Sequence, residues 1–287
     1  MEHRLRPPSP RGPPMNALPN RRSLTVTRGR IGIQRLSVSF GAHAAVEDFS
    51  LEIEPGEFVC LLGPSGCGKS TALNAVAGFL RPARGRVAVD GVEVTGPGPE
   101  RGMVFQQHSL FPWKTVLENV AFGPRMQGKT RAEARDLARE YLDLVGLGGS
   151  AQRYPAALSG GMAQRVGIAR ALVNHPSVLL MDEPFGALDA QTRSIMQESL
   201  LRLWGQIGNT VLFVTHDIDE ALFLADRVVV MSAAPGRVLL DLRLDLPRPR
   251  PEDVFATPQF AEHKRQCLRL IRQESRRAFD FIDGAGI

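Results

Sequence analysis

Residues 63–70 have the types and spacing of a loop that binds phosphate. The run is Gly63, Pro64, Ser65, Gly66, Cys67, Gly68, Lys69 and Ser70, followed by Thr71, and it fits the pattern G-x-x-x-x-G-K-[ST]. The glycines let the backbone curl so that successive N–H groups point at phosphate oxygens. Lys69 supplies a positive charge for the β- and γ-phosphates, and Ser70 supplies a hydroxyl ligand for Mg²⁺. The segment therefore predicts a nucleoside triphosphate site.

A second group of residues delivers carboxylates. The four apolar residues Val178–Met181 predict a buried strand that ends at Asp182 and Glu183. Asp182 is expected to serve the Mg²⁺ through water, and Glu183 is placed to accept a proton from the attacking water or to polarise it. Asp182-Glu183-Pro184 is also a composition found where helices start. The phosphate-binding pattern upstream favours the catalytic interpretation.

Strands and helices alternate along the chain, which predicts an α/β fold with a largely parallel sheet. The run Phe58–Leu62 is continuously apolar, as in a strand buried on both faces, and it leads directly into the phosphate loop. Period-two alternation over 31–53 and the hairpin signal Asp90-Gly91 predict further strands. The other expected elements are helices near 72–79, 130–145, 160–174, 190–207, 218–225 and 259–274, and strands over 85–89, 92–94, 178–181, 210–215 and 227–231.

A third motif resembles one particular family. Residues 158–165, Leu-Ser-Gly-Gly-Met-Ala-Gln-Arg, are similar to the signature sequence of ABC ATPases, and they lie just before the strand of Asp182 as they do in that family. The resemblance covers about residues 31–235, with the motifs in the family's order. Two departures are Met162, where many members carry glutamine, and Phe40, which replaces the commoner tyrosine and keeps only its stacking face.

The resemblance implies a role for each residue that fits a family motif. Phe40 would stack on adenine, Asp189 would belong to the D-loop, and His216 would contact the γ-phosphate and hold Glu183 in place. Gln106 would be the switch-loop glutamine, which also serves the Mg²⁺ together with Ser70 and Asp182. We choose it over its neighbour Gln107 because it directly follows Val-Phe, as in the family pattern. The signature residues expected to contact nucleotide are Ser159, Gly160 and Gly161.

The resemblance also implies an architecture and an assembly. The fold would be that of a P-loop NTPase with a RecA-like core, an antiparallel β subdomain and a helical subdomain at about 108–165, all within residues 30–240. In this family, two subunits pack head to tail, and each signature caps the γ-phosphate held by the other. The implied cofactors are ATP and Mg²⁺, and the implied assembly is a homodimer whose formation is coupled to nucleotide binding.

Two classes of function compete within this family. In a transporter, residues 108–116 would contact a separate permease, whereas in DNA-repair or ribosome-associated members the ATPase would act on nucleic acid. Members of the second class usually carry a coiled-coil insertion, zinc modules or two cassettes, none of which is visible here. No segment has the roughly 18–20 apolar residues of a membrane span, so any membrane role needs a partner. We therefore expect a homodimer with two permease subunits at the cytoplasmic face of the bacterial inner membrane, and no nucleic-acid partner.

The sequence around Gln106 resembles one group of importers. Residues 96–106 and the run Leu110-Phe111-Pro112-Trp113 are similar to the nitrate, sulfonate and taurine group, which implies a small anionic solute delivered by an extracytoplasmic solute-binding protein. The apolar run is either a partner surface or packing inside the helical subdomain. The solute itself is selected by the other components, so this chain does not encode its identity.

The basic charge of the chain is confined to its N-terminal end. The formal net charge is +5, but residues 1–30 carry seven arginines and one acidic residue, so the remainder carries a net charge of −1. A nucleic-acid-binding body usually presents a basic face, which this balance disfavours. Residues 1–29 lack the apolar stretch of a signal peptide and are rich in proline, so we expect disorder there, with either no function or a weak electrostatic role.

The cysteines and the C-terminal end complete the expectations. Cys60, Cys67 and Cys267 show no C-x-x-C spacing, which argues against a disulfide framework or a zinc site and favours a reducing cytosol. Cys67 is either a small residue that fits the loop or a redox-sensitive group whose modification blocks ATP hydrolysis. Residues 241–287 are expected to form a Pro/Arg-rich linker and an amphipathic tail helix, packed on the body or offered to a partner.

Overall fold

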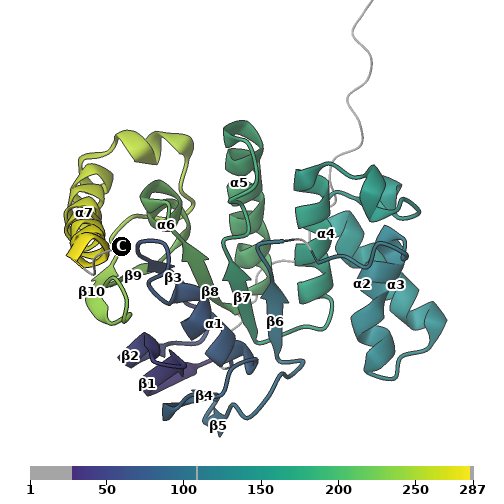
Figure 1. Ribbon diagram of the computed structural model, residues 1–287. Coiled ribbons are helices and arrows are strands. Elements are labelled where there is room, and N and C mark those ends of the chain that lie inside the picture. Colours follow the sequence, from purple (N-terminus) through teal and green to yellow (C-terminus); the bar gives the residue numbers. More distant parts are fainter. Residues whose placement is uncertain (1–27, 108, 285–287) are drawn as a thin grey trace, which may run out of the picture.

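The computed structural model describes residues 28–107 and 109–284 and has a six-stranded sheet at its centre (Figure 1). The strand order is β10-β9-β3-β8-β7-β6, and the five strands from β9 to β6 run parallel. Three of these strands coincide with their predicted bounds, and the strand predicted at 178–181 is one residue longer. The six strands are β3 (Phe58–Leu62), β6 (Arg101–Val104), β7 (Val178–Asp182), β8 (Thr210–Thr215), β9 (Arg227–Met231) and β10 (Val238–Arg243).

A second, antiparallel sheet has the order β2-β1-β4-β5. Its strands are β1 (Ile31–Phe40), β2 (His43–Ile53), β4 (Arg84–Val89) and β5 (Val92–Glu93). The predicted hairpin is present, because Asp90 and Gly91 both adopt positive φ between β4 and β5, as a two-residue hairpin turn requires. The Asp90 carboxylate also accepts hydrogen bonds from the backbone N–H groups of Gly29 and Arg30, which fixes the start of β1 beside the turn.

The described residues form seven α-helices around the two sheets. Their bounds are α1 (Lys69–Ala77), α2 (Val116–Met126), α3 (Arg131–Leu144), α4 (Gly160–Leu172), α5 (Ala190–Ile207), α6 (Ile218–Leu224) and α7 (Pro258–Gly284). Figure 1 shows α2, α3 and α4 together at one end of the molecule and α7 at the other. Helices α2 and α3 each begin with a capping box, in which Thr115 pairs with Glu118 and Thr130 with Glu133.

The six-stranded sheet separates two hydrophobic cores. Alternate residues of β3 point to opposite faces, so that Phe58, Cys60 and Leu62 pack with helices α2–α7, whereas Val59 and Leu61 pack with α1 and the antiparallel sheet. Both faces of β3 are therefore buried, which explains why its sequence is continuously apolar rather than alternating. Helices α1 and α4 consequently contribute to different cores.

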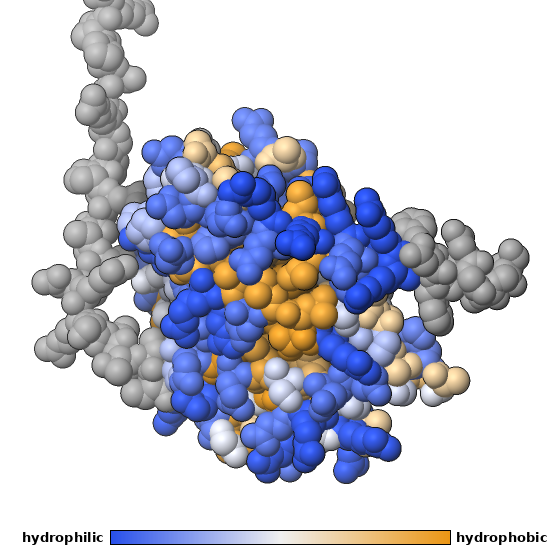
Figure 2. Space-filling model, turned by 90° about the vertical axis from the view of Figure 1, so that its left-hand side faces the viewer, coloured by the Kyte–Doolittle hydropathy of each residue, from blue (hydrophilic) through white to orange (hydrophobic). Residues whose placement is uncertain are grey.

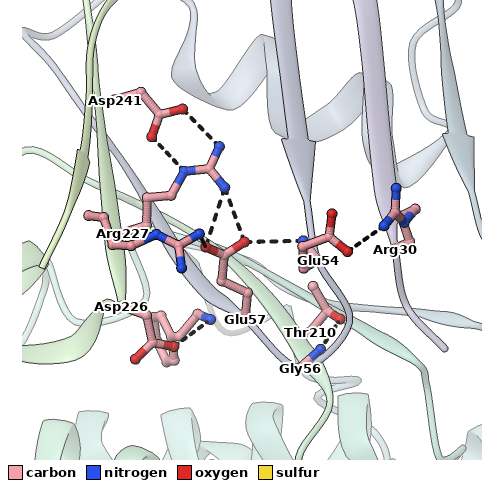
Figure 3. Close-up of polar contacts among 10 residues, drawn as sticks. Arg30, Glu54, Gly56, Glu57, Thr210, Asp226, Arg227 and Asp241 are labelled. Atoms are coloured by element: carbon pink, nitrogen blue, oxygen red, sulfur yellow. Dashed lines mark hydrogen bonds and ion pairs between the residues drawn. The ribbon is translucent and has the colours of Figure 1, made fainter. Parts of the chain in front are cut away.

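A polar cluster joins β3, β9 and β10 at the edge of the sheet where β3 and β9 begin (Figure 3). The Arg227 guanidinium donates to the Glu57 carboxylate at 3.1 Å and to the Asp241 carboxylate at 2.8 Å, so it joins the start of β3 to β9 and β10. Asp226 accepts a hydrogen bond from the backbone N–H of Phe58. This cluster lies at the edge of the sheet opposite the phosphate loop. The edge that carries the loop is therefore not occupied by these ion pairs.

The segment expected as a linker is part of the folded body. Strand β10 runs across the expected boundary at residue 240 and pairs antiparallel with β9. Beyond it, Arg250 is buried and donates from one guanidinium nitrogen to the carbonyls of Leu222, Phe223 and Ala225, where α6 ends. Burial lowers the pKa of Arg250 to about 10. The prolines and arginines close together in this segment suggested a linker. In the structure, Arg248 and Arg250 instead donate hydrogen bonds to the backbone carbonyls at the end of α6.

The tail helix packs on the body and is longer than expected. Phe260 and Cys267 of α7 are buried, and the buried Glu274 accepts a hydrogen bond from the backbone N–H of Ala233 after β9. Figure 2 views this face, where hydrophobic residues gather in its centre within a hydrophilic surround. Half-buried Leu242 of β10 and Ile271 of α7 pack against the core. Within the described residues, no helix combines the length and the apolar character needed to cross a membrane.

The carbonyl contacts of Arg250 generate a stability prediction. Arg250→Met keeps an apolar side chain but leaves the buried carbonyls at the end of α6 without donors, which should lower the free energy of unfolding by about 2–4 kcal/mol. Urea unfolding followed by circular dichroism measures this. The control is Arg269→Met on the exposed side of α7, which should change stability by no more than about 0.5 kcal/mol. Equal effects of the two substitutions would contradict the proposed role of Arg250.

Candidate nucleotide-binding site

The predicted site residues lie along one edge of the six-stranded sheet. Strands β3, β8, β7 and β6 are adjacent and parallel, so their carboxyl ends share an edge. The phosphate loop follows β3, Asp182 ends β7, His216 follows β8, and Gln106 lies two residues beyond β6. Four motifs that are far apart in the sequence therefore meet because neighbouring strands end together.

The phosphate loop is a tight turn around the Lys69 ammonium. Lys69 begins α1 and is only 5% exposed, and its Nζ lies 2.8 Å from the carbonyl oxygen of Gly63 and 2.9 Å from that of Pro64. Gly68, with φ of 94°, caps the helix, and a Cβ there would lie 2.5 Å from the carbonyl oxygen of Ala45. The positive end of the α1 dipole and the ammonium thus converge on the same loop, an arrangement that favours an anion.

Ser70 and Asp182 form the link between the loop and β7. The Ser70 hydroxyl donates to the Asp182 carboxylate at 2.8 Å. Burial raises the pKa of Asp182, and the Ser70 hydrogen bond opposes that shift. Hydroxyl and carboxylate oxygens are the ligands that Mg²⁺ accepts, and it usually keeps waters and substrate phosphates as its remaining ligands. The described residues accordingly contain no group of three or more His, Cys, Asp or Glu side chains that could hold a metal ion by themselves.

Glu183 and His216 form a hydrogen-bonded pair beside this link. The distance between Glu183 Oε2 and His216 Nδ1 is 2.9 Å. Glu183 has a positive φ of 41°, which is uncommon for a residue with a side chain and costs about 1–3 kcal/mol. Its backbone N–H donates to the carbonyl of Val214, so β8 holds the strained residue in place. The strained residue lies at the point where the sequence predicts the catalytic base.

The signature residues lie at the start of α4 and pack against α5. Ser159 caps α4 by accepting a hydrogen bond from the backbone N–H of Met162. A Cβ on Gly161 would lie 2.8 Å from the Thr192 methyl carbon, so glycine is needed for this close approach, and Gly160 lies beside Leu188. Asp189 caps α5 through the backbone N–H of Thr192 at 2.9 Å, and this hydrogen bonding lowers the pKa of Asp189.

The two remaining predicted residues are exposed. The Phe40 side chain lies at the end of β1 and is 53% exposed, so its ring is accessible for stacking. Gln106 is exposed at the shared edge of the sheet. Their positions suit the predicted roles, which stay predictions.

Sequence reasoning missed a buried asparagine that shapes the segment after Gln106. Asn119 of α2 is fully buried, and its Nδ2 donates to the carbonyls of Phe111, Lys114 and Thr115. Its Oδ1 accepts from the backbone N–H of Phe111. The apolar run is therefore held as a defined loop, in which Trp113 is 71% exposed. An asparagine inside an apolar helix face was the available signal.

A cleft of about 560 Å³ lies between this loop, α4 and the segment before β6. Arg170 of α4 donates to the carbonyl of Ser109 and lies over the Phe111 ring, which fixes one wall of the cleft. The ring of Phe111 also packs against Phe122, with 4.9 Å between ring centroids. The cleft is lined by Pro97, Gly98, Pro99, Arg101, Gly102, Met103, Phe105, Ser109, Phe111, Phe122, Arg170, Ala171 and Asn174.

The family follows from comparison with known proteins. The sequence profile of the ABC transporter family matches residues 46–186. A nitrate import ATP-binding protein of Synechocystis sp. is 48% identical over 238 residues, which is 81% of this chain and 90% of that protein. A taurine import ATP-binding protein of Chromobacterium violaceum is 55% identical over 211 residues, 73% of this chain and 81% of the relative. The chain belongs to the ABC transporter family.

A solved structure agrees with this assignment. A dimeric ATP-binding cassette in a post-hydrolysis state with ADP and phosphate has a TM-score of 0.66 and 33% identity, and the match covers 76% of this chain and 100% of that one. The predicted ABC ATPase fold, with parallel and antiparallel sheets, is thereby confirmed. ATP binding follows from the same family and structure.

In this ABC protein, burial disfavours reaction of the Cys67 thiol. Cys67 is 1% exposed, and burial raises its pKa, although the neighbouring Lys69 opposes the shift. Because the thiolate is the reactive form, iodoacetamide at neutral pH should label Cys67 at least about 100-fold more slowly in the folded protein than in urea. Mass spectrometry of the tryptic peptides over time measures this. Cys60 and Cys267 are also buried and serve as internal controls. Rapid labelling of Cys67 alone in the folded protein would show that the loop opens.

Proposed function

We propose that this protein is the ATP-binding and ATP-hydrolysing subunit of an ABC importer that drives uptake of a small solute through a separate permease. The observation that carries the proposal is the convergence of Lys69, Ser70, Asp182, Glu183 and His216 at one sheet edge, with Glu183 hydrogen-bonded to His216. The relatives named as nitrate and taurine import proteins favour import over action on nucleic acid or ribosomes.

The chemistry assigns a task to each group. The loop N–H groups and Lys69 hold the β- and γ-phosphates, and Ser70 and Asp182, with Gln106, would hold Mg²⁺, which when bound neutralises phosphate charge. Glu183 accepts the proton of the attacking water or polarises it. The 2.9 Å hydrogen bond from His216 orients the Glu183 carboxylate.

A second subunit completes each site. Helices α1 and α4 contribute to cores on opposite faces of the sheet, which supports signature residues Ser159, Gly160 and Gly161 acting on the nucleotide of a partner rather than on their own chain's. The similar solved cassette is dimeric. The protein accordingly works as a head-to-tail homodimer with two ATP molecules at the interface, where Asp189 also lies.

The exposed loop of Trp113 is the surface offered to the permease. An exposed tryptophan beside a cleft is the kind of anchor that interfaces use. Residue 108, at the start of the predicted contact segment 108–116, lies outside the described residues. We place the dimer on two permease subunits at the cytoplasmic face of the inner membrane, with an extracytoplasmic binding protein that delivers a small anion such as nitrate, taurine or another sulfonate.

Removal of the catalytic carboxylate tests the enzymatic half of the proposal. Glu183→Gln should lower phosphate release by about 10²–10⁴-fold because the general base is lost, while ATP binding is retained. The variant should therefore accumulate as an ATP-bound dimer on size exclusion. Glu93→Gln, at an exposed position of β5, is the matched control and should hydrolyse ATP normally. Wild-type turnover by Glu183→Gln would remove Glu183 from this role.

Loss of the exposed anchor tests the transport half. Trp113→Ala should leave basal ATP hydrolysis of the isolated subunit unchanged and should lower the stimulated hydrolysis of the permease complex by about 10-fold, as expected for a hot-spot side chain. The assay uses the complex reconstituted with the permease and a panel of binding proteins loaded with nitrate, taurine or alkanesulfonates. Met126→Ala changes a residue of similar exposure in the same subdomain and should leave stimulation intact. Normal stimulation in Trp113→Ala would refute the assignment of this surface.

A further inference from the structure

The start of α5 and the start of α6 are joined by one arginine. Arg193 lies in the first turns of α5, and its Nη2 donates to the backbone carbonyl of Leu188 at 2.9 Å. Its Nη1 lies 3.7 Å from Oδ2 of Asp217, the residue that caps α6. Leu188 directly precedes Asp189 in the D-loop, and Asp217 directly follows His216. Arg193 thus spans the two segments in a single side chain.

The segment that holds His216 is tightly bonded on both sides. The Asp217 backbone N–H donates to the Thr215 hydroxyl oxygen at 3.0 Å, and the Asp217 carboxylate accepts from the backbone N–H of Glu220 at 3.1 Å. Glu220 is buried, and its carboxylate accepts hydrogen bonds from Thr215 and from Gln197 of α5. A displacement of Asp217 is therefore passed to its neighbour His216 and to the Glu183 hydrogen bond.

Local helix stability does not account for an arginine at this place. The amino-terminal end of a helix carries partial positive charge, so a cation in the first turns of α5 is unfavourable for that helix. In addition, the buried Arg193 Nε has no hydrogen-bond partner among the described residues, so the guanidinium forgoes one donor while it reaches Leu188 and Asp217. The side chain of Arg193 therefore stabilises its contacts with Leu188 and Asp217 rather than helix α5.

We propose that Arg193 is a positioning residue that couples the D-loop to His216. The α4–α5 packing continues the path, because Gly160 and Gly161 of the signature lie against Leu188 and Thr192. A second subunit that binds at residues 187–189 shifts the Leu188 carbonyl, and Arg193 passes the shift to Asp217, so the hydrolytic geometry forms only when the partner is seated. This inference rests on the proposed ATPase function and assigns a regulation to the same site.

The experiment compares Arg193→Ala, Arg193→Lys and Arg202→Ala in the full-length chain, with wild type measured in parallel. Arg202 lies on the exposed side of the same helix, and within the described residues its side chain hydrogen-bonds only to Ser199 one turn away, so it controls for loss of a surface arginine from α5. The readouts are kcat, the KM for ATP, the Hill coefficient for ATP and the thermal midpoint. Wild-type hydrolysis tests the proposed function, and the variants then test the coupling.

Arg193→Ala should lower kcat by about 10- to 100-fold, the cost of a misplaced catalytic group, with the KM for ATP within about twofold of wild type. Its Hill coefficient should fall toward one, because the partner's binding is no longer sensed. Lysine can reach only one of the two acceptors at a time, so the kcat and Hill coefficient of Arg193→Lys should lie between those of wild type and Arg193→Ala. Arg202→Ala should match wild type. A normal kcat and Hill coefficient in Arg193→Ala would overturn the inference. Equal losses in Arg193→Ala and Arg202→Ala with a lowered thermal midpoint would overturn it too, since the effect would then be structural.

Discussion

The parallel register of β3, β8 and β7 is the constraint on which the site depends. Leu62 pairs with Thr215, and Asp182 pairs with Val214, so the three strands end at the same level. In this register the Ser70 hydroxyl reaches Asp182 at 2.8 Å. A slip of one residue would also turn every buried side chain of a strand to the opposite core, so packing on both faces protects the geometry of the site.

The two edges of the six-stranded sheet differ: one is closed by ion pairs, and the other carries a strained residue. At the amino-terminal edge, Arg227 and its carboxylate partners satisfy one another and close the strands. At the carboxyl edge, Glu183 holds a positive φ at a cost of about 1–3 kcal/mol, whereas the Lys69 ammonium is held by favourable hydrogen bonds to carbonyl oxygens. Strain of this kind persists only where the surroundings determine it fully, and the ordered edge helps to provide that rigidity.

The sequence predicted the fold well where local rules and burial agree. Strands β3, β8 and β9 have their predicted bounds, because each contains a continuous apolar run (58–62, 211–214 and 228–231) that is bounded by polar residues or glycine. Helix α2 was missed because Gly123 and Pro124 interrupt its pattern, although its capping box was visible. Strand β10 and the docking of Arg250 depend on residues far away in the sequence, and no local pattern encodes them. The strand-end positions of the phosphate loop, Asp182 and Glu183 could be predicted from the apolar runs before them, whereas Asn119 and Arg193 act through hydrogen bonds to backbone carbonyls that belong to no sequence motif.

Helix α5 connects the parts of the cassette that the motifs name separately. Its first turn is capped by Asp189, touches Gly161 through Thr192, and further along contributes Gln197 to the buried Glu220. Gly161 has no side chain, and the Thr192 methyl would lie 2.8 Å from any added Cβ, so α4 and α5 are in close contact at this point. Close-packed contacts of this kind switch between arrangements rather than deform gradually. The proposed coupling therefore extends from Gly161 through residues 187–189 to the segment of His216, because α5 contacts all three.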